Sequence, residues 1–385
     1  MMPRVAHIAT VDVTLGVLLE GQLRAQRDAG FDVTTISAPG RWAAELEAQG
    51  IRHIAWKHAT RGWDPWEDAR AFIELFTILG RERFDIVHTH TAKPGVMGRI
   101  AARLRGVPVV VNTVHGFDAS PDHPLHRRAL FMGLEWVAAR FSDLELYQSE
   151  ADLARARRLR MVAPSKAILI GNGTDLRRFD PAASNGKARE LRRDLGIPET
   201  SVVVGTVGRI VAEKGYREFF AAARAVRAST PDIRFLAVGD LDPSKADALG
   251  SDELAAARSD VIFTGWRDDM PELLSAMDVF VLASWREGVP RSAVEAAAMG
   301  KPLVLSDIPG CRQVGREGDD ALFVPPRDAG SLTMAITHLV SNPERASAMG
   351  RSARMRALER FDEDRIAKVT IDRYEALLGH VRVSR

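Results

Sequence analysis

Two glutamates eight positions apart, Glu287 and Glu295, stand in the stretch of this chain that is best suited to chemistry. The apolar run Asp278-Val-Phe-Val-Leu282 precedes them and predicts a buried parallel strand, and a helix is expected to begin near Ser292. Glu287 is therefore expected in the loop beyond the carboxyl end of a strand, where open α/β sheets bind ligands. Glu295 is expected in the first helical turn, where its carboxylate could accept hydrogen bonds from a pair of hydroxyls such as a ribose diol.

The amides near Gly288 and Val289 add backbone hydrogen-bond donors at the start of this helix, suited to a phosphate or a sugar. The spacing of the two glutamates alone does not show whether they bind a ligand, because Glu is also common in the first turn of ordinary helices. The distinction has to come from the rest of the chain.

Two cations, Arg209 and Lys214, follow another predicted strand at residues 201–208. Both are expected at the carboxyl edge of the sheet, near the start of the next helix. Two positive charges aimed at a departing diphosphate can do what a divalent metal does in other enzymes. The pair Asp240-Leu-Asp242 resembles a metal-binding motif only in its letters, because it precedes Pro243 in a predicted loop. No metal site is predicted there.

Histidines follow two strands in the first half of the chain. His88 and His90 are two apart on a predicted strand, so they share a face and could bind a metal, but no Asp or Cys follows at ligand spacing. We therefore predict no metal. A second apolar run, at residues 107–114, delivers His115 to the same carboxyl edge, either to contact a ligand or merely to satisfy its own loop.

Composition narrows the class of protein. The chain has 385 residues, and at about 150 residues per domain it should form two or three domains. Its 53 basic and 51 acidic residues leave a net charge of +2, which argues against wholesale nucleic-acid binding. Basic residues outnumber acidic ones over residues 81–180, which could favour an anionic surface. The single cysteine, Cys311, excludes a disulfide framework and fits a reducing compartment.

Neither a signal peptide nor an apolar run of 18 residues is visible in the sequence. We expect a cytoplasmic protein that could lie peripherally on the inner face of the cell membrane.

Apolar runs and amphipathic stretches alternate along the first half, a pattern typical of a parallel sheet with helices on both faces. The strands are predicted at 4–9, 32–37, 51–55, 85–89, 107–114, 143–148 and 167–170, and the helices at 16–29, 41–49, 66–80, 95–105, 124–140 and 150–160. The first strand–helix turn, residues 10–16, contains only Gly16 where a dinucleotide fold would have Gly-x-Gly-x-x-Gly. This disfavours NAD binding. In the same turn, Asp12 and Thr14 could bond a sugar hydroxyl or cap the next helix.

The second half repeats the plan, with strands near 233–240, 261–267, 278–282, 302–305 and 322–325, followed only by helices at 328–341, 343–359 and 363–380. Turn formers crowd residues 170–181. We predict a first domain over 1–181, a linker with a short helix over 182–199, a second domain over 200–362, and a final segment over 363–385.

Taken together, these motifs resemble the signature of retaining GT-B glycosyltransferases of family 4. The segments that carry the resemblance are Glu-x7-Glu at 287–295, Ala298-Met-Gly-Lys-Pro-Leu-Val304, Gly208-Arg209 before Lys214, His-x-His at 88–90, Thr113-Val-His-Gly-Phe117 and Asn172-Gly-Thr-Asp175. The resemblance implies an α/β chain of two Rossmann-like domains facing each other across a cleft. It also implies that the last helix, near Asp364–Leu378, crosses back onto the first domain.

The resemblance further implies transfer of a sugar from a nucleotide-diphosphate sugar, with UDP the expected nucleotide, to an acceptor hydroxyl, with retention of configuration and without a metal or other cofactor. Arg209 and Lys214 would neutralise the β-phosphate, Glu295 would hold the ribose, and Glu287 and His115 would support the sugar. These four (His115, Arg209, Lys214 and Glu287) are the catalytic candidates. The implied nucleotide-sugar contacts are Gly16, Gly208, Arg209, Lys214, Gly265, Trp266, Arg267, Glu287, Gly288, Val289, Pro290 and Glu295.

On the acceptor side, the candidates are His88, His90, Lys93 and Asp118. Within the family the motifs look most like those of enzymes that build bacterial surface polysaccharide on lipid-diphosphate carriers, so a glycan or lipid-linked acceptor is expected. Two other functions stay open at this stage. A UDP-sugar 2-epimerase would share the architecture, and a non-catalytic protein would bind the nucleotide sugar without turnover.

Overall fold

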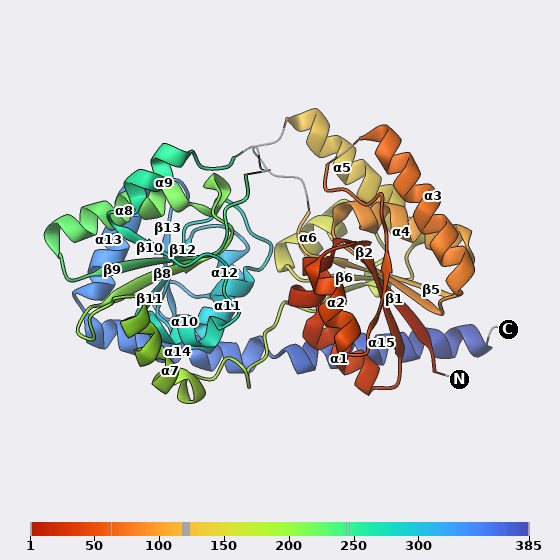
Figure 1. Cartoon of the computed structure of the whole chain (residues 1–385). Coiled ribbons are helices and arrows are strands. Elements are labelled where there is room, and N and C mark those ends of the chain that lie inside the picture. The colour runs from red at the N-terminus through yellow and green to blue at the C-terminus, as the bar shows by residue number, and fades with distance from the viewer. Residues whose placement is uncertain (1, 63, 118–123, 244, 246, 384–385) are drawn as a thin grey trace. The chain divides into compact units, whose positions relative to one another are not determined.

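The computed structural model describes residues 2–62, 64–117, 124–243, 245 and 247–383. The chain divides into two compact units (Figure 1). Unit 1 comprises Met1–Asn172 together with Glu363–Arg385, and unit 2 comprises Gly173–Asp362. Within the described residues, no helix is both long and apolar enough to cross a bilayer.

Unit 1 is built on a seven-stranded parallel sheet with the strand order β3-β2-β1-β4-β5-β6-β7. Its strands are β1 (Arg4–Val11), β2 (Asp32–Ala38), β3 (Arg52–Ala55), β4 (Ile86–His90), β5 (Val109–Val114), β6 (Leu144–Tyr147) and β7 (Ala167–Leu169). Every predicted strand of the first half is present, within two residues at each end. The neighbours β1 and β4 pair in parallel, which sets His7 beside His88.

The helical segments of unit 1 lie between these strands in the sequence, except for the last one, which ends the chain. They are η1 (Thr14–Leu18), α1 (Glu20–Asp28), α2 (Arg41–Ala48), α3 (Pro65–Glu82), α4 (Ala92–Leu104), α5 (Leu125–Ala138), η2 (Ala139–Phe141), α6 (Glu150–Arg158), η3 (Pro164–Lys166) and α15 (Glu363–Val383). The start of α3 shows how the sequence fixes an end. Asp64 accepts hydrogen bonds from the Trp66 and Glu67 amides, and Pro65 occupies the first helical position.

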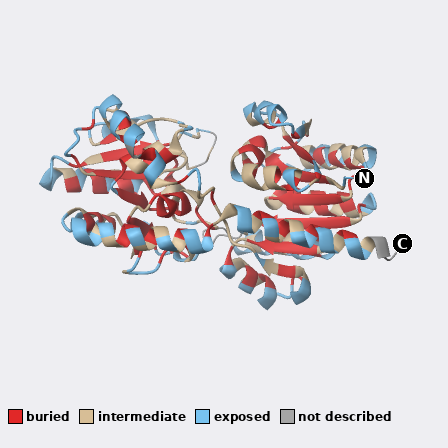
Figure 2. Cartoon of the chain, turned by 90° about the horizontal axis from the view of Figure 1, so that it is seen from below, coloured by how far each residue is buried: buried red, intermediate tan, exposed pale blue. Residues whose placement is uncertain are grey.

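Helices cover both faces of this sheet. On one face, Leu75 of α3 and Ala101 of α4 pack with Ile8 and Val110, which belong to the strands. On the other face, α1 and α15 pack together, and Tyr374 of α15 is fully buried in that core. Figure 2 shows the strands as buried and the outer faces of the helices as exposed. The last helix of the chain is therefore an integral layer of unit 1.

Unit 2 is built on a six-stranded parallel sheet with the order β10-β9-β8-β11-β12-β13. Its strands are β8 (Val203–Val207), β9 (Arg234–Val238), β10 (Val261–Phe263), β11 (Val279–Leu282), β12 (Leu303–Ser306) and β13 (Ala321–Val324). The helical segments are α7 (Pro181–Asp194), η4 (Ala212–Lys214), α8 (Tyr216–Ser229), α9 (Ser251–Ala257), α10 (Met270–Ala276), α11 (Arg291–Ala298), α12 (Cys311–Val314), α13 (Ala329–Val340) and α14 (Pro343–Arg360). Both units therefore have the predicted Rossmann-like organisation.

The predicted linker over 182–199 differs from what the structure shows. The two units divide at Asn172 and Gly173, and α7 packs against α10 inside unit 2. The reason is local: Asp180 caps α7, and Ala188 and Leu191, one turn apart, are buried in the unit 2 core. The segment contributes to a hydrophobic core, so it is not a spacer.

Candidate active site

The carboxyl edge of the unit 2 sheet brings Lys214 and Glu287 together. Lys214 ends η4, which follows β8, and Glu287 lies in the loop after β11. The Lys214 Nζ lies 2.6 Å from Glu287 Oε1, which also accepts a hydrogen bond of 2.8 Å from the Ser284 hydroxyl. The side chains of Lys214 and Glu287 are only 22% and 13% exposed, so the ion pair is held in place while its outer edge stays accessible.

Two glycines allow the backbones of the loops around Lys214 and Glu287 to pack closely against neighbouring backbone segments. A Cβ atom at Gly215, whose φ is +75°, would overlap the carbonyl oxygen of Ala283. A Cβ atom at Gly310, at the start of α12, would overlap the carbonyl oxygen of Gly288. Only glycine fits such contacts. The loop that carries Glu287, Gly288, Val289 and Pro290 is therefore packed tightly against its neighbours.

Arg209 follows Gly208 in the loop after β8 and is neutralised by carboxylates. Its Nη1 lies 3.0 Å from Asp242 Oδ2, and its Nη2 lies 3.7 Å from Glu213 Oε1. The Arg209 side chain is 40% exposed. Both cations predicted to meet a diphosphate are thus paired with carboxylates in this structure, and an anionic ligand would have to exchange with those carboxylates.

Glu295 lies one turn inside α11, because Pro290 is the N-cap and the helix begins at Arg291. The first-turn placement expected from the sequence is therefore wrong by about one residue. Glu295 is 8% exposed and accepts a hydrogen bond of 2.8 Å from Arg291 Nε. Its carboxylate is held by its own helix.

A hollow of about 460 Å³ lies at the ends of β9 and β10 and is lined in part by Gly239, Asp240, Arg258 and Gly265. The Trp266 amide donates a hydrogen bond of 2.9 Å to Asp240 Oδ1, which fixes the loop on this hollow. Sequence reasoning named Gly265 and missed Asp240 and Ser284. Both missed residues come two positions after the end of a strand, and that signal would have identified them.

Trp266 and Arg267 are engaged within the same loop. The indole N–H of Trp266 donates to Asp268, with the ring 40% exposed, and Arg267 forms a two-point ion pair with Asp269. Side-chain recognition of a nucleobase by Arg267 would need this ion pair to open.

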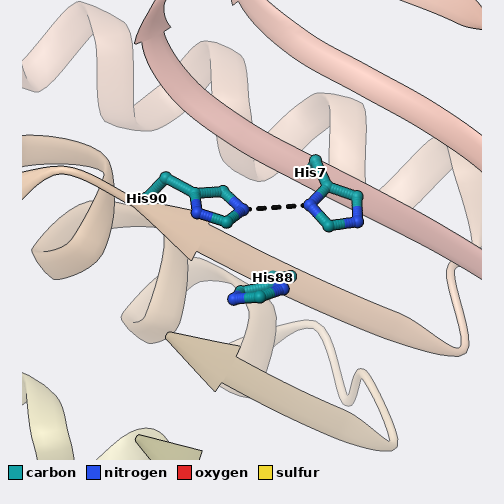
Figure 3. Close-up of side chains that lie close together, drawn as sticks. All are labelled: His7, His88 and His90. Carbon is teal, nitrogen blue, oxygen red and sulfur yellow. Dashed lines mark hydrogen bonds between the residues drawn. The ribbon is translucent and has the colours of Figure 1, made fainter. Parts of the chain in front are cut away.

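In unit 1, four histidines lie along the sheet from β1 to the end of β5. Figure 3 shows the rings of His7 and His90 directed at each other, with His88 beneath them. His7, His88 and His90 are completely buried. Burial lowers the pKa of His7 and of His115 to about 4 and holds the pKa of His88 and His90 well below the usual value, so all four are neutral near pH 7.

The hydrogen bonds of these neutral rings run in one direction. The Nε2–H of His7 donates to Gln26 Oε1 at 2.6 Å, so the other ring nitrogen of His7 accepts from His90 Nε2 at 2.9 Å. The Nδ1 of His90 then accepts from His115 Nε2 at 3.1 Å. His115, at the carboxyl edge, is also hydrogen-bonded to the Gln148 side chain. Its ring orientation is therefore set by residues that come from other strands and helices.

His7, His88 and His90 are close enough to share an ion, with ligand atoms within 4.8 Å of one another. Each ring nitrogen nevertheless has a hydrogen-bond partner within unit 1. His88 bonds Tyr374 of α15 at 2.5 Å and Thr113 at 2.7 Å, and the other two histidines use the chain described above. The cluster satisfies its own polar atoms and does not require an ion.

Three acceptor-side candidates lie in the interior. His88 and His90 are fully buried, and Lys93 is 4% exposed, with its ammonium bonded to Asp68, Thr60 and Gly62. This burial argues against the predicted direct contact with an acceptor. Period-2 spacing placed the two histidines on one face of a strand, and α15 covers that face. The fourth candidate, Asp118, lies outside the described residues.

Gly16 and Asp12, in the first strand–helix turn, both contact Trp42 of α2. A Cβ atom at Gly16 would lie 2.8 Å from Trp42 Cβ, so glycine is required there for packing against α2. Asp12 accepts hydrogen bonds from the amides of Val13 and of Trp42, the second residue of α2, so it holds the start of α2 and does not cap the next helix as one of the two alternatives expected. Both residues therefore hold α2 against the first strand–helix turn.

Comparison with known proteins supplies the family. Residues 16–178 match the family model "Glycosyltransferase Family 4", and residues 201–342 match "Glycosyl transferases group 1". The chain is 30% identical to an Escherichia coli UDP-Gal:α-D-GlcNAc-diphosphoundecaprenol α-1,3-galactosyltransferase, over 96% of this chain and 97% of the relative. It is 24% identical to a Campylobacter jejuni N,N'-diacetylbacillosaminyl-diphospho-undecaprenol α-1,3-N-acetylgalactosaminyltransferase, over 93% and 95%.

Among solved structures, Anabaena HepE in complex with UDP aligns with a TM-score of 0.80 at 20% identity, over 97% of this chain and 100% of that chain. This likeness shows the GT-B fold. Because the sequence relationship extends through both units, the chain belongs to the family 4 glycosyltransferases of the GT-B fold.

Proposed function

We propose that this glycosyltransferase transfers a sugar from a UDP-sugar to a hydroxyl of a lipid-linked saccharide, with retention of anomeric configuration and without a metal ion. Unit 2 binds the nucleotide sugar, and unit 1 binds the acceptor. The observation that carries the proposal is the placement of Arg209, Lys214 and Glu287 at the carboxyl edge of the unit 2 sheet.

The chemistry of this edge suits a diphosphate leaving group. As the bond between sugar and phosphate breaks, negative charge grows on the β-phosphate, and Lys214 and Arg209 supply two positive charges to it. Glu287, released from Lys214, then orients hydroxyls of the transferred sugar. Glu295 accepts hydrogen bonds from the ribose, and the hollow beside Asp240 and Gly265 receives the base. The UDP complex of HepE, which shares this fold, supports uridine as the nucleoside.

The acceptor class rests on the relatives. The E. coli and C. jejuni proteins are both named as transferring a sugar to a saccharide on diphospho-undecaprenol, and the resemblance to them extends through unit 1. A hydroxyl of an amino sugar on a lipid diphosphate is therefore the acceptor that we propose for this chain, in the synthesis of a surface glycan.

We further propose that α5 lies on an anionic membrane surface. Leu125, Leu130, Trp136 and Val137 of this helix are between 42% and 78% exposed, which is unusual for large apolar side chains on a single helix. Arg127 is exposed on the same helix, and the Arg140 guanidinium stacks over the Trp136 ring just beyond it. Apolar side chains mixed with arginines fit the boundary between headgroups and acyl chains.

The test uses purified full-length protein. UDP, GDP and ADP are compared by thermal shift with and without a chelator, and at 100 times its dissociation constant the right nucleotide should stabilise by about 2.7 kcal/mol. Transfer is then assayed from UDP-sugars to a synthetic N-acetylhexosamine diphosphate lipid, with the anomeric coupling of the product read by NMR.

We expect stabilisation by UDP alone, no effect of the chelator, and a product of unchanged anomeric configuration. Stabilisation by GDP or ADP in place of UDP would contradict the assignment of the nucleotide. Release of an epimerised UDP-sugar without acceptor would replace the transferase function by an epimerase function. Loss of activity on chelation would contradict the metal-free mechanism.

A further inference from the structure

Arg99 of α4 is completely buried between two carboxylates. Its Nη1 lies 2.7 Å from Glu145 Oε1, and its Nη2 lies 2.5 Å from Glu135 Oε2. Glu145, in β6, is 1% exposed, and Glu135, in α5, is 14% exposed. One guanidinium against two carboxylates leaves one negative charge in the interior of unit 1. Such a charge is costly unless something outside the triad compensates it.

The two carboxylates are not equally satisfied. Both oxygens of Glu145 are used, since Arg99 and the Ser142 hydroxyl donate to Oε1 and the Asn112 amide donates to Oε2. Glu135 receives its hydrogen bond from Arg99 on Oε2. Within the part of the chain that the structure describes, Glu135 Oε1 has no hydrogen-bond partner. Burial raises the pKa of Glu135 above its usual value, and the Arg99 charge offsets part of that effect.

Glu135 lines a cavity at the ends of β4 and β5. The other lining residues that matter here are Thr91, Val96, His115, Phe131 and Met132. The cavity offers about 20 Å³ of open space, enough for one group the size of a hydroxyl or a water molecule. Its walls combine apolar side chains with the polar side chains of Thr91, Asn112, Thr113, His115 and Glu135, of which Asn112 and Thr113 are hydrogen-bonded to other residues of unit 1. A group that enters it would be held by few but well-defined polar contacts.

We propose that Glu135 determines acceptor specificity by accepting, on Oε1, a hydrogen bond from an uncharged hydroxyl or amide N–H of the acceptor sugar. This inference rests on the proposed function and adds the residue by which unit 1 recognises the sugar. The surplus negative charge of the triad indicates which end of a lipid-linked acceptor, the sugar or the diphosphate, Glu135 would bind. A diphosphate would be repelled by the surplus negative charge of the triad, whereas a hydroxyl or N–H group donates to it.

Position also favours the sugar end of the acceptor. The same cavity is lined by His115, whose ring is fixed by the hydrogen-bond chain from Gln26 through His7 and His90. A sugar group bonded to Glu135 would thus contact two side chains whose orientations are set in advance. Rigid polar groups of this kind discriminate strongly, because a sugar that lacks the matching group leaves an oxygen of this carboxylate, whose side chain is only 14% exposed, without its hydrogen bond.

The decisive variant is Glu135→Gln, which keeps an oxygen for Arg99 and turns the free oxygen into an amide N–H₂. The KM for the lipid-linked acceptor and for the UDP-sugar, the kcat and UDP-induced thermal stabilisation are measured on wild type and variant. We expect the KM for the acceptor to rise at least tenfold, while UDP stabilisation and the melting temperature without ligand stay close to wild type. Glu82→Gln is the matched control, since Glu82 also pairs with arginines in unit 1 but does so at its surface.

A second readout separates recognition from a structural role. Acceptor analogues, each lacking one hydroxyl or the N-acetyl group, are compared on both proteins. One analogue should be a poor acceptor for wild type, and Glu135→Gln should no longer distinguish it from the complete acceptor. Val96→Leu, which narrows the cavity without touching the ion triad, should also raise the KM for the acceptor.

Two results would overturn the inference. One is a Glu135→Gln variant with an unchanged KM for the acceptor and the wild-type ranking of analogues. The other is a variant whose UDP stabilisation falls in parallel with its acceptor binding, which would show a general structural defect. Failure of the proposed function looks different, because wild type itself would then neither bind UDP nor transfer sugar.

Discussion

At the scale of single residues, the candidate site of unit 2 is a set of opposite charges in contact. Lys214 pairs with Glu287, and Arg209 pairs with Asp242. These pairs keep the cations ordered before a ligand arrives, which lowers the cost of ordering them later. They also predict that phosphate binding competes with internal carboxylates, so the role of each cation can be tested by neutralising it.

Lys214→Ala is expected to lower kcat by about 10² to 10³-fold, because a partly buried, preoriented cation contributes most when charge develops on the leaving group. Steady-state kinetics at saturating UDP-sugar measure the effect, and circular dichroism checks the fold. Lys187→Ala is the control. Lys187 is an exposed lysine of the same unit that forms an ion pair with Glu272, and its loss should leave kcat unchanged. A Lys214→Ala enzyme with near wild-type turnover would refute the leaving-group role.

At the scale of elements, the strands bring the site residues to one edge of each sheet, and the helices decide which of those residues stay accessible. In unit 1, α15 covers the face that carries His88, through the hydrogen bond of Tyr374. By contrast, α5 leaves much of its apolar surface in solvent. We therefore expect α15 to stabilise the core of unit 1 and α5 to bind a surface outside the protein.

Leu130→Glu together with Trp136→Glu on α5 should weaken binding to phosphatidylglycerol vesicles at least tenfold, because both changes remove apolar area and add negative charge at an anionic surface. Vesicle co-sedimentation measures this effect, and neutral phosphatidylcholine vesicles should bind wild type less well than the anionic ones do. Ile73→Glu on α3 is the control, since Ile73 is 64% exposed in the same unit but lies outside α5. Equal loss in the control would remove α5 as the membrane surface.

At the scale of the whole molecule, the two units differ in their titratable cores. Unit 1 holds the neutral cluster of His7, His88, His90 and His115, of which the first three are fully buried, whereas the single histidine of unit 2, His338, is exposed. The folded cluster binds fewer protons than the unfolded chain between pH 6.5 and about 4, since burial lowers these pKa values. The two units should therefore respond differently to acid.

The stability of unit 1 is expected to be fully present above pH 6.5 and to fall as the pH drops towards 4. Each buried histidine contributes up to about 1.4 kcal/mol per pH unit in that range. Scanning calorimetry between pH 7.5 and 5 should show one transition moving down more steeply than the other. His338→Gln should not alter this difference, while His7→Gln should reduce the slope of the unit 1 transition. Parallel shifts of both transitions would contradict the assignment.

The sequence by itself determined the alternation of strands and helices, the two Rossmann-like sheets and the loops where Arg209, Lys214 and Glu287 lie. These follow from short-range rules: hydrophobic period, strand length and the turn residues that follow each strand. The glycosyltransferase family could also be identified from the sequence, because its motifs place particular residue types at fixed positions in such loops.

Only the tertiary structure decided which side chains face a ligand. Period-2 spacing put His88 and His90 on one face, but the helix that covers this face comes from residues almost 300 positions later, as the contact between His88 and Tyr374 shows. The surplus charge at Glu135 likewise depends on Arg99 and Glu145, which are brought together from different elements. Burial and charge balance depend on contacts between segments far apart in the chain, so no local pattern in the sequence determines them.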